Sequence, residues 1–224
     1  MKKQNIAISQ PGEGRKERKE QNQDYCVSVG NIAVVLDGCG SAIQSEIGAK
    51  MFGEAIRKNS LKLNPQNFEK FINDCMFKCF KSRTEKDFIN KFQFTILLCF
   101  EESDRFIVFS SGDGYIITIN NNNKLELIEI INQLEENAPE YWSYNMMDNQ
   151  KRNIDIFPFK KLIFSKKEYS NVYVSSDGIR FIVNGEKLLF DEFCELLNEK
   201  NSEKLSDFFK ESEETLKDDT SIAM

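Results

Sequence analysis

Four short acidic clusters, far apart in the sequence, contain the residues that could do chemistry. Each lies beside a turn-forming or an apolar segment, and they are Asn22-Gln23-Asp24, Asp37-Gly38-Cys39-Gly40-Ser41, Ser176-Asp177-Gly178 and Lys217-Asp218-Asp219-Thr220. A carboxylate at the end of a buried strand is costly unless something compensates its charge. Several of them at one end of a sheet indicate a bound divalent cation, because hard cations such as Mg²⁺ and Mn²⁺ prefer oxygen ligands.

The chain contains no histidine. This excludes every Ser-His-Asp and Cys-His nucleophile scheme, every histidine-ligated zinc site and the commonest general acid. Any chemistry at the acidic clusters must therefore use carboxylates, cations and metal-bound water.

Length and composition indicate a globular chain. With 224 residues, 40% of them hydrophobic, it can bury a substantial core, and we expect a single domain over residues 1–224. The 19 phenylalanines are expected to fill that core. The six cysteines form no Cys-x-x-Cys pair, and we expect them to be reduced.

Charge and hydropathy limit the kinds of partner. A chain with a formal net charge of −6 has no general attraction for nucleic acid or anionic membranes, and we expect neither as a partner. No apolar run approaches the ~20 residues that cross a bilayer. The N-terminal Met1-Lys2-Lys3-Gln4-Asn5 lacks the apolar segment of a signal peptide. Because we expect the cysteines to be reduced, we expect the protein to be cytoplasmic. We also expect it to be a monomer.

Apolar periodicity and turn residues predict the elements that position the clusters. The polar segment 11–22 is expected to be a loop, followed by strands at 23–29 and 32–36 joined at Gly30-Asn31. A helix is predicted from Ser41 to about residue 58, with Gln44 completing a capping box. Its predicted core face consists of Ile43, Ile47, Met51, Ala55 and Ile56.

The middle of the chain is predicted to contain a second helix over 65–82 and then an antiparallel meander, with strands at 92–100, 106–110, 115–120 and 124–130. Residues 132–153 are predicted to be irregular. Trp142 and Tyr144 lie in this segment, and either of two roles is possible for them: lining a flap that faces the substrate, or packing in the core.

Two more strands near 154–164 and 171–175, helices at 178–184, 188–198 and 202–210, and a last strand at 220–224 complete the chain. This order predicts an α+β domain whose antiparallel sheets carry helices on their faces.

Together with Gly112-Asp113-Gly114, the clusters resemble, in this order, the motifs of the type 2C protein phosphatases, the metal-dependent Ser/Thr phosphatase family. The resemblance covers essentially the whole chain, and it is greatest to a compact bacterial branch whose first motif ends in Asn-Gln-Asp. Each motif alone is weak, because Asp-Gly is a common turn, but all five at family-like spacing are specific. The resemblance implies a four-layer αββα sandwich of two antiparallel sheets flanked by helices.

The resemblance also implies roles for individual residues. Asp24 contributes to the metal site, Asp37 bridges two metals, and the Gly38 carbonyl binds one of them. Asp177 and Asp218 bind the second metal, and Asp113 can help to hold a third. The implied cofactor is therefore Mg²⁺ or Mn²⁺, with two ions and an optional third. A water shared by two metals has a lowered pKa and attacks phosphorus in line, which makes Asp37 a catalytic residue as well as a ligand.

Several positions depart from the family pattern. Cys39 stands where many members have a histidine, and Asp219 stands where the last motif has an asparagine. Lys19 stands where many members carry an arginine that contacts phosphate, and Gly12-Glu13-Gly14-Arg15 aligns with a Gly-x-x-His element of the compact branch. Arg15, Arg18 and Lys19 are all candidate phosphate contacts, with Arg15 preferred. The alternative is a solvated loop whose charges pair with neighbouring glutamates.

The expected function is that of a metal-dependent phosphoserine and phosphothreonine protein phosphatase. Its partner would be a phosphorylated protein, either a Ser/Thr kinase or a kinase substrate. Two alternatives stay open: a weakly active or inactive binding module that keeps the fold, and a hydrolase of small phosphate esters.

Overall fold

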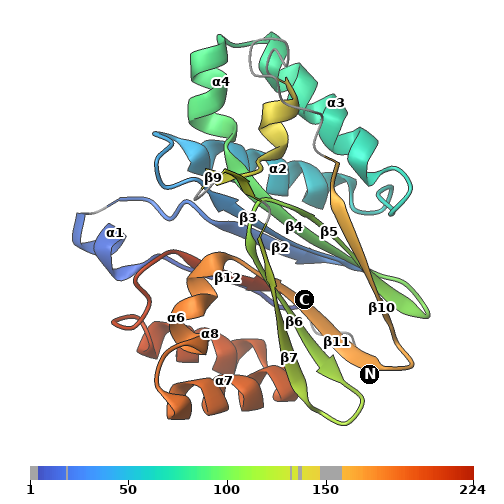
Figure 1. Cartoon of the computed structure of the whole chain (residues 1–224), viewed down its shortest axis with the longest axis vertical. Helices are drawn as coiled ribbons and strands as arrows, with labels where there is room; N and C mark the ends of the chain where they lie inside the picture. Colours follow the sequence, from blue (N-terminus) through green and yellow to red (C-terminus); the bar gives the residue numbers. More distant parts are fainter. Residues whose placement is uncertain (1–4, 19, 132, 136–137, 147–157) are drawn as a thin grey trace.

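The computed structural model describes residues 5–18, 20–131, 133–135, 138–146 and 158–224. Within them the chain forms two five-stranded sheets, with helices on their outer sides (Figure 1). This arrangement confirms the expected α+β fold, a four-layer αββα sandwich. None of the described helices is long and apolar enough to cross a membrane.

The first sheet carries the Asp37 cluster at the end of its β3 strand. In spatial order its strands are β10 (Lys160–Ser165), β5 (Arg105–Ser111), β4 (Phe94–Glu101), β3 (Ile32–Gly38) and β2 (Tyr25–Val29). All neighbours pair antiparallel. The apolar run Ile32–Leu36 is buried throughout, because both faces of this strand are covered.

The second sheet carries the two C-terminal clusters. In spatial order its strands are β1 (Ala7–Gln10), β12 (Thr220–Ala223), β11 (Tyr169–Ser175), β6 (Gly114–Asn120) and β7 (Leu125–Ile130), all antiparallel. The short strands β8 (Gln133–Glu135) and β9 (Ala138–Pro139) pair only with each other.

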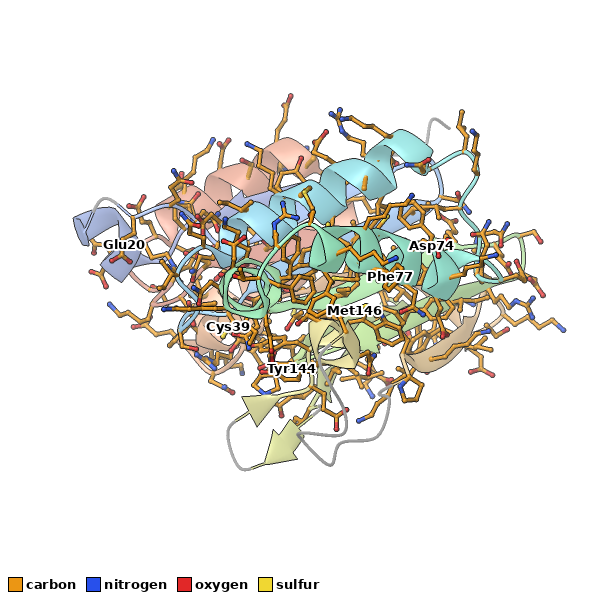
Figure 2. All side chains as sticks on the ribbon, turned by 90° about the horizontal axis from the view of Figure 1, so that it is seen from above. Glu20, Cys39, Asp74, Phe77, Tyr144 and Met146 are labelled. Carbon is orange, nitrogen blue, oxygen red and sulfur yellow. The ribbon has the colours of Figure 1, made fainter. Side chains whose placement is uncertain are left out.

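Helices cover the outer face of each sheet. The first sheet is covered by α2 (Ser45–Asn59), α3 (Phe68–Lys81), α4 (Glu85–Phe92) and the 3₁₀ helix η1 (Trp142–Met146). Figure 2 shows η1, with Met146, lying beneath α3 and its Phe77. The second sheet is covered by η2 (Asp177–Ile179), α6 (Arg180–Val183), α7 (Lys187–Glu199) and α8 (Ser202–Glu211). A further helix, α1 (Glu13–Arg18), lies beside the sandwich (Figure 1).

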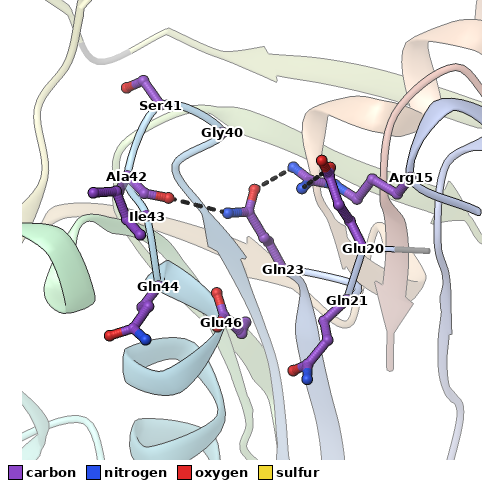
Figure 3. A pocket seen from close by; sticks show the side chains of 10 residues that line it. All are labelled: Arg15, Glu20, Gln21, Gln23, Gly40, Ser41, Ala42, Ile43, Gln44 and Glu46. Carbon is purple, nitrogen blue, oxygen red and sulfur yellow. Dashed lines mark hydrogen bonds and ion pairs between the residues drawn. The ribbon is translucent and has the colours of Figure 1, made fainter. Parts of the chain in front are cut away.

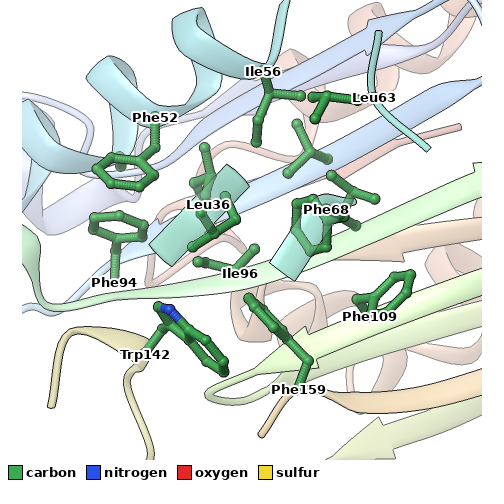
Figure 4. Packing of buried hydrophobic residues seen from close by; sticks show 14 of the residues in the cluster. Leu36, Phe52, Ile56, Leu63, Phe68, Phe94, Ile96, Phe109, Trp142 and Phe159 are labelled. Carbon is green, nitrogen blue, oxygen red and sulfur yellow. The ribbon is translucent and has the colours of Figure 1, made fainter. Parts of the chain in front are cut away.

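Phenylalanine fills the layer between the first sheet and its helices, as the composition predicts (Figure 4). Phe68 is fully buried, and its ring centroid lies 5.2 Å from those of Phe109 and Phe159. Trp142 stacks on Phe159 at 4.2 Å, and its Nε1 donates to Asn73 at 3.2 Å. Trp142 is therefore a core residue and not part of a flap.

Helix α2 differs from the prediction in its start and in its inward face. Residues 41–44 form a turn, and the helix begins at Ser45, whose hydroxyl donates to the Cys39 carbonyl at 3.1 Å. No capping box forms, since Gln44 is itself the N-cap residue. Ile43, Ile47 and Met51 are 75%, 40% and 36% exposed, and the buried residues are Ser45, Gly48, Ala49, Phe52, Gly53 and Ile56.

Two glycines explain which face of α2 turns inward. A Cβ at Gly48 would collide with the Lys91 carbonyl, and one at Gly53 would collide with the Tyr25 ring. Close packing at these two positions turns the helix so that Phe52 and Ile56, and not the three exposed residues, enter the core.

The predicted meander is wrong at one connection. Strands β5 and β6 belong to different sheets, and the turn Ser111-Gly112-Asp113-Gly114 carries the chain between them. Gly112 and Gly114 have φ values of 92° and 132°, which side-chain-bearing residues rarely adopt. This crossover brings Asp113 to the end of the sandwich where Asp37 lies.

Other differences concern short elements. Phe92 ends α4 and does not begin a strand, so β4 starts at Phe94. The Thr84 side chain caps α4 by accepting from the Asp87 N–H at 3.2 Å. Strand β1 and helix α1 were not expected, and α1 lies in the predicted loop 11–22.

Candidate metal centre

A pocket of about 120 Å³ lies at one end of the sandwich and draws its walls from both sheets. It contains the predicted residues Asp37, Gly38, Asp113, Asp177 and Asp218. Its other lining residues are Arg15, Cys39, Gly40, Thr95, Tyr141 and Asp219. Of the predicted ligands, Asp24 is not part of this lining, and it contacts the site from behind.

Asp37 and Asp113 enter the pocket from the first sheet and from the crossover turn. Asp37 is the register partner of Thr95 on β4. The Thr95 hydroxyl donates to Asp113 Oδ1 at 3.0 Å and so fixes the turn relative to the sheet. A Cβ at Gly38 would lie only 2.7 Å from the Gln23 carbonyl oxygen and the Ser45 hydroxyl, so this position needs glycine.

Asp177 and Asp218 flank strands of the second sheet, Asp177 just after β11 and Asp218 just before β12, and they share one guanidinium. Arg180 Nη1 lies 2.7 Å from Asp177 Oδ2, and its Nη2 lies 3.4 Å from Asp218 Oδ2. The sequence analysis missed Arg180. Its spacing of three residues after Asp177 on a short helical segment is the signal that could have identified it.

Asp24 is buried, with 6% of its surface exposed, and neither of its carboxylate oxygens accepts a hydrogen bond. The hydroxyls of Ser176 and Ser221 lie nearby and oppose the rise of its pKa without reaching it in hydrogen-bond geometry; they contact the Asp219 carbonyl and Ser9 Oγ. Burial, and then the charge of Asp219, raises the pKa of Asp24 to about 7. A carboxylate in this position needs a positive charge that the described side chains do not supply.

The other carboxylates repel one another in the same way. Burial, followed by the charges of Asp24 and Asp177, raises the pKa of Asp37 well above its ordinary value. Burial also raises the pKa of Asp177 to about 6, with Arg180 opposing the shift and Asp113 and Asp218 adding to it. Like charges gathered in this way favour a bound cation.

Asp219 anchors Arg15 and the segment before α1. Its Oδ1 accepts from the Gly12 N–H at 2.9 Å, and its Oδ2 accepts from the Gln23 N–H at 2.7 Å and from Arg15 Nε at 2.7 Å. Arg15 also contacts the Gln23 side chain through Nη2, and its Nη1 lies 3.7 Å from Glu20 Oε2. Arg15 is thereby held at the pocket wall. Lys19 and the side chain of Arg18 lie outside the described residues, so their role stays a prediction.

Two further lining residues, Cys39 and Tyr141, lie in the same pocket. Cys39 Sγ lies 3.1 Å from Ser41 Oγ, at the position where the family pattern has a histidine. Tyr141 is buried, and burial together with the neighbouring Cys39 raises the pKa of its hydroxyl. Sequence reasoning missed Tyr141, because no motif surrounds it.

The donor set fits a hard divalent cation. Among the described residues, no group of three or more His, Cys, Asp or Glu side chains already has the arrangement of a ligand shell. The pocket nevertheless offers oxygen donors of like charge, and the two Asp24 oxygens have no partner. Oxygen-only donors are what Mg²⁺ and Mn²⁺ select.

Comparison with solved structures identifies the same fold in bacterial phosphatases. The chain is similar to a bacterial serine phosphatase, with a TM-score of 0.69, 16% identity and coverage of 98% of this chain and 95% of that one. It is also similar to the serine/threonine phosphatase Stp1 from Staphylococcus aureus, with a TM-score of 0.67, 16% identity and coverage of 98% and 92%. The catalytic domain of the phosphatase PstP, in complex with two manganese ions, gives a TM-score of 0.65 and 10% identity over 98% and 95% of the chains.

Sequence comparison places the chain in a family. A search of curated protein sequences gave no significant match. A profile of the protein phosphatase 2C family matches residues 11–220. This match runs from just before α1 to the start of β12 and includes every aspartate of the pocket. The chain therefore belongs to the protein phosphatase 2C family.

Proposed function

We propose that this chain is a metal-dependent phosphoserine and phosphothreonine protein phosphatase. One observation carries the proposal: carboxylates from both sheets converge on one small pocket, and behind it Asp24 has two buried oxygens without a partner. Family membership supports the same reaction class.

Asp37, Asp177, Asp218, Asp24 and the Gly38 carbonyl would hold two ions, and Asp113 would help to hold a third. Bound Mg²⁺ or Mn²⁺ would lower the pKa of water and neutralise the charge of the phosphate group. Asp37 is held at the end of β3 by the pairing of this strand with β4, where its register partner is Thr95. Thr95 does the same for Asp113 through its hydrogen bond.

Arg15 is the described residue best placed to bind the phosphate group. Asp219 holds its Nε, so that the guanidinium stands at the pocket wall. The planar guanidinium can donate two parallel hydrogen bonds to phosphate oxygens. Lys19, four residues further along the chain, is a second candidate from its place in the motif alone.

The substrate would be a phosphorylated protein, and a Ser/Thr kinase or a kinase substrate is the partner that this reaction implies. The similar solved proteins are described as serine or serine/threonine phosphatases, which supports that choice. We further propose a cytoplasmic location and a monomer, as expected from the sequence.

Hydrolysis assays test the proposal. A phosphothreonine peptide and an aryl phosphate are incubated with the purified protein in Mn²⁺, in Mg²⁺ and in chelator. We expect turnover with metal only. In the Asp37→Asn variant, activity should fall by more than the roughly 10- to 100-fold decrease that follows removal of an outer-sphere metal partner. Asp207→Asn, on the exposed side of α8, is the matched control and should keep full activity.

Each outcome separates the alternatives. Peptide hydrolysis that disappears in Asp37→Asn supports the protein phosphatase. Turnover of small esters without turnover of any phosphopeptide would favour a small-molecule hydrolase. A folded protein that binds Mn²⁺ but hydrolyses neither substrate would contradict the proposal in favour of a binding module.

A further inference from the structure

A second and larger hollow lies next to the acidic pocket. This groove has a volume of about 500 Å³ and lies between Arg15 and residues 20–23 on one side and the turn before α2 on the other (Figure 3). That volume is within the range of roughly 300–1,000 Å³ that is usual for ligand sites. None of the aspartates of the acidic pocket lines it.

The groove and the acidic pocket share a wall. Arg15 and Gly40 line both of them. Because Asp219 and Gln23 hold the Arg15 side chain, this wall is fixed. Gln23 also donates to the Ala42 carbonyl at 3.3 Å, which joins the two sides of the groove at its base (Figure 3). A phosphate bound beside Arg15 would therefore have the rest of its molecule at the mouth of the groove.

The lining of the groove has a negative charge balance and one apolar contact point. Glu46 contributes a carboxylate, and so does Glu20, whose Oε2 lies 3.7 Å from Arg15 Nη1; Arg15, the cation among the lining residues, also pairs with Asp219 outside the groove. Ile43 lies at its edge and is 75% exposed, because the turn over residues 41–44 keeps it out of the core. A ligand with a basic group and an apolar side chain would complement this surface.

We propose that this groove binds the polypeptide that flanks the phosphorylated residue of the substrate, and that it selects a basic side chain next to that residue. This inference rests on the proposed phosphatase function and deepens it. A small phosphate ester fills only the acidic pocket, whereas a peptide must also pass Arg15 and Gly40 into the groove. Glu46 is then a specificity-determining residue, and Ile43 contributes affinity for any peptide.

Two phosphothreonine peptides test the charge preference. They are identical except that lysine or glutamate flanks the phosphothreonine, and kcat/KM is measured for both and for an aryl phosphate. We expect the wild-type protein to prefer the lysine peptide by about tenfold. Glu46→Lys should remove or invert that preference, while kcat/KM for the aryl phosphate stays within about twofold.

The matched control is Glu203→Lys. Glu203 occupies the same position in α8 that Glu46 occupies in α2, the second residue of the helix, so both changes have the same effect on the helix dipole. Ile43→Ser should lower kcat/KM for both peptides, and Leu188→Ser, at an equally exposed leucine on α7, should not. An unchanged peptide preference in Glu46→Lys, or the same change in both glutamate variants, would overturn the inference.

A binding measurement separates this inference from the proposed function. The same peptides, carrying a fluorophore, are titrated with the protein in Mn²⁺ and followed by anisotropy. If the wild-type protein hydrolyses nothing, the phosphatase proposal fails. Tighter binding of the lysine peptide that is lost in Glu46→Lys would still support the groove, whereas equal affinities would refute it.

Discussion

Asp24 is the residue whose surroundings match its charge least. Its two oxygens are buried without a hydrogen bond, and the carboxylates of Asp37 and Asp219 lie close enough to perturb it. Natural proteins rarely leave a buried charge in this state unless it serves a ligand. The charge of Asp24 should therefore lower the stability of the metal-free protein.

We predict that Asp24→Asn stabilises the metal-free protein by about 1–3 kcal/mol, because it removes a buried charge that faces like charges. Urea denaturation in chelator measures this. Asp74→Asn, at an exposed aspartate on α3, is the control and should change stability by no more than about 0.5 kcal/mol. A less stable Asp24→Asn variant would show that the carboxylate is compensated in a way that the hydrogen bonds do not reveal.

Asp219 differs from Asp24, because its oxygens accept hydrogen bonds from two backbone N–H groups and from Arg15. We predict that Asp219→Asn destabilises the protein by about 1–3 kcal/mol, because the new amide would point a donor at one of three existing donors. Denaturation in chelator should show a smaller loss for Asp218→Asn, whose side chain is 42% exposed. Equal losses would argue against the anchoring role of Asp219.

At this scale the sequence identified the acidic residues but not the side chains that hold them. Asp37, Asp113, Asp177 and Asp218 carry their own turn and strand signals, and the structure brings them into one pocket. Thr95 and Tyr141 carry no such signal. They reach the pocket only because β4 pairs with β3 and because η1 packs against the first sheet. These contacts depend on the tertiary structure and cannot be predicted from the local sequence.

Among the elements, the crossover turn between β5 and β6 has the strictest sequence requirement. Gly112 combines a φ of 92° with a Cβ position that would collide with Thr95, whereas Gly30, at a φ of 63°, has open space around its Cβ position. Glycine is therefore required at position 112 by both backbone geometry and packing, and at position 30 by backbone geometry alone.

We predict that Gly30→Ala costs about 1–2 kcal/mol of stability, the usual penalty for a side chain in the left-handed region. Gly112→Ala should cost more, because the methyl group must also displace Thr95. Urea denaturation of both variants compares the two costs directly. Similar values would mean that Thr95 moves aside freely, and Asp113 would then not be held by it.

The strands were easier to predict than the helix faces. A strand buried on both sides is a continuous apolar run, so β3, β4 and β5 are visible in the sequence, but such a run does not tell which sheet the strand joins. For α2, apolar periodicity predicted a core face that included Ile43, Ile47 and Met51, which are exposed. The inward face is instead set by the two glycines that let the helix approach Lys91 and Tyr25.

At the scale of the whole molecule, the sandwich has three separate apolar layers: one under each set of helices and one between the sheets. The sequence resemblance predicted this architecture, because it rests on motifs spread from Asp24 to Asp219. Hydrophobic periodicity alone predicted only antiparallel sheets with helices on their faces.

We predict that Mn²⁺ or Mg²⁺ raises the melting temperature. A ligand at 100 times its dissociation constant stabilises the folded state by about 2.7 kcal/mol. For a chain of this size, that corresponds to an increase of about 5–10 °C. Thermal unfolding with metal and with chelator measures the shift. The shift should be absent in Asp37→Asn and present in Asp207→Asn, and a shift of equal size in both would place the ion elsewhere.

The division of the pocket between the two sheets has a consequence for how the molecule opens. Asp37 lies near the end of a strand of the first sheet, whereas Asp177 and Asp218 lie next to strands of the second. Between the sheets is a layer of mainly aliphatic side chains. Without an ion, each sheet can open with its own helices, and the backbone amides of β3 and β11 should exchange with solvent deuterium at separate rates. An ion bound to both sheets must be released before either opens, so these amides should then exchange together, as one cooperative unit.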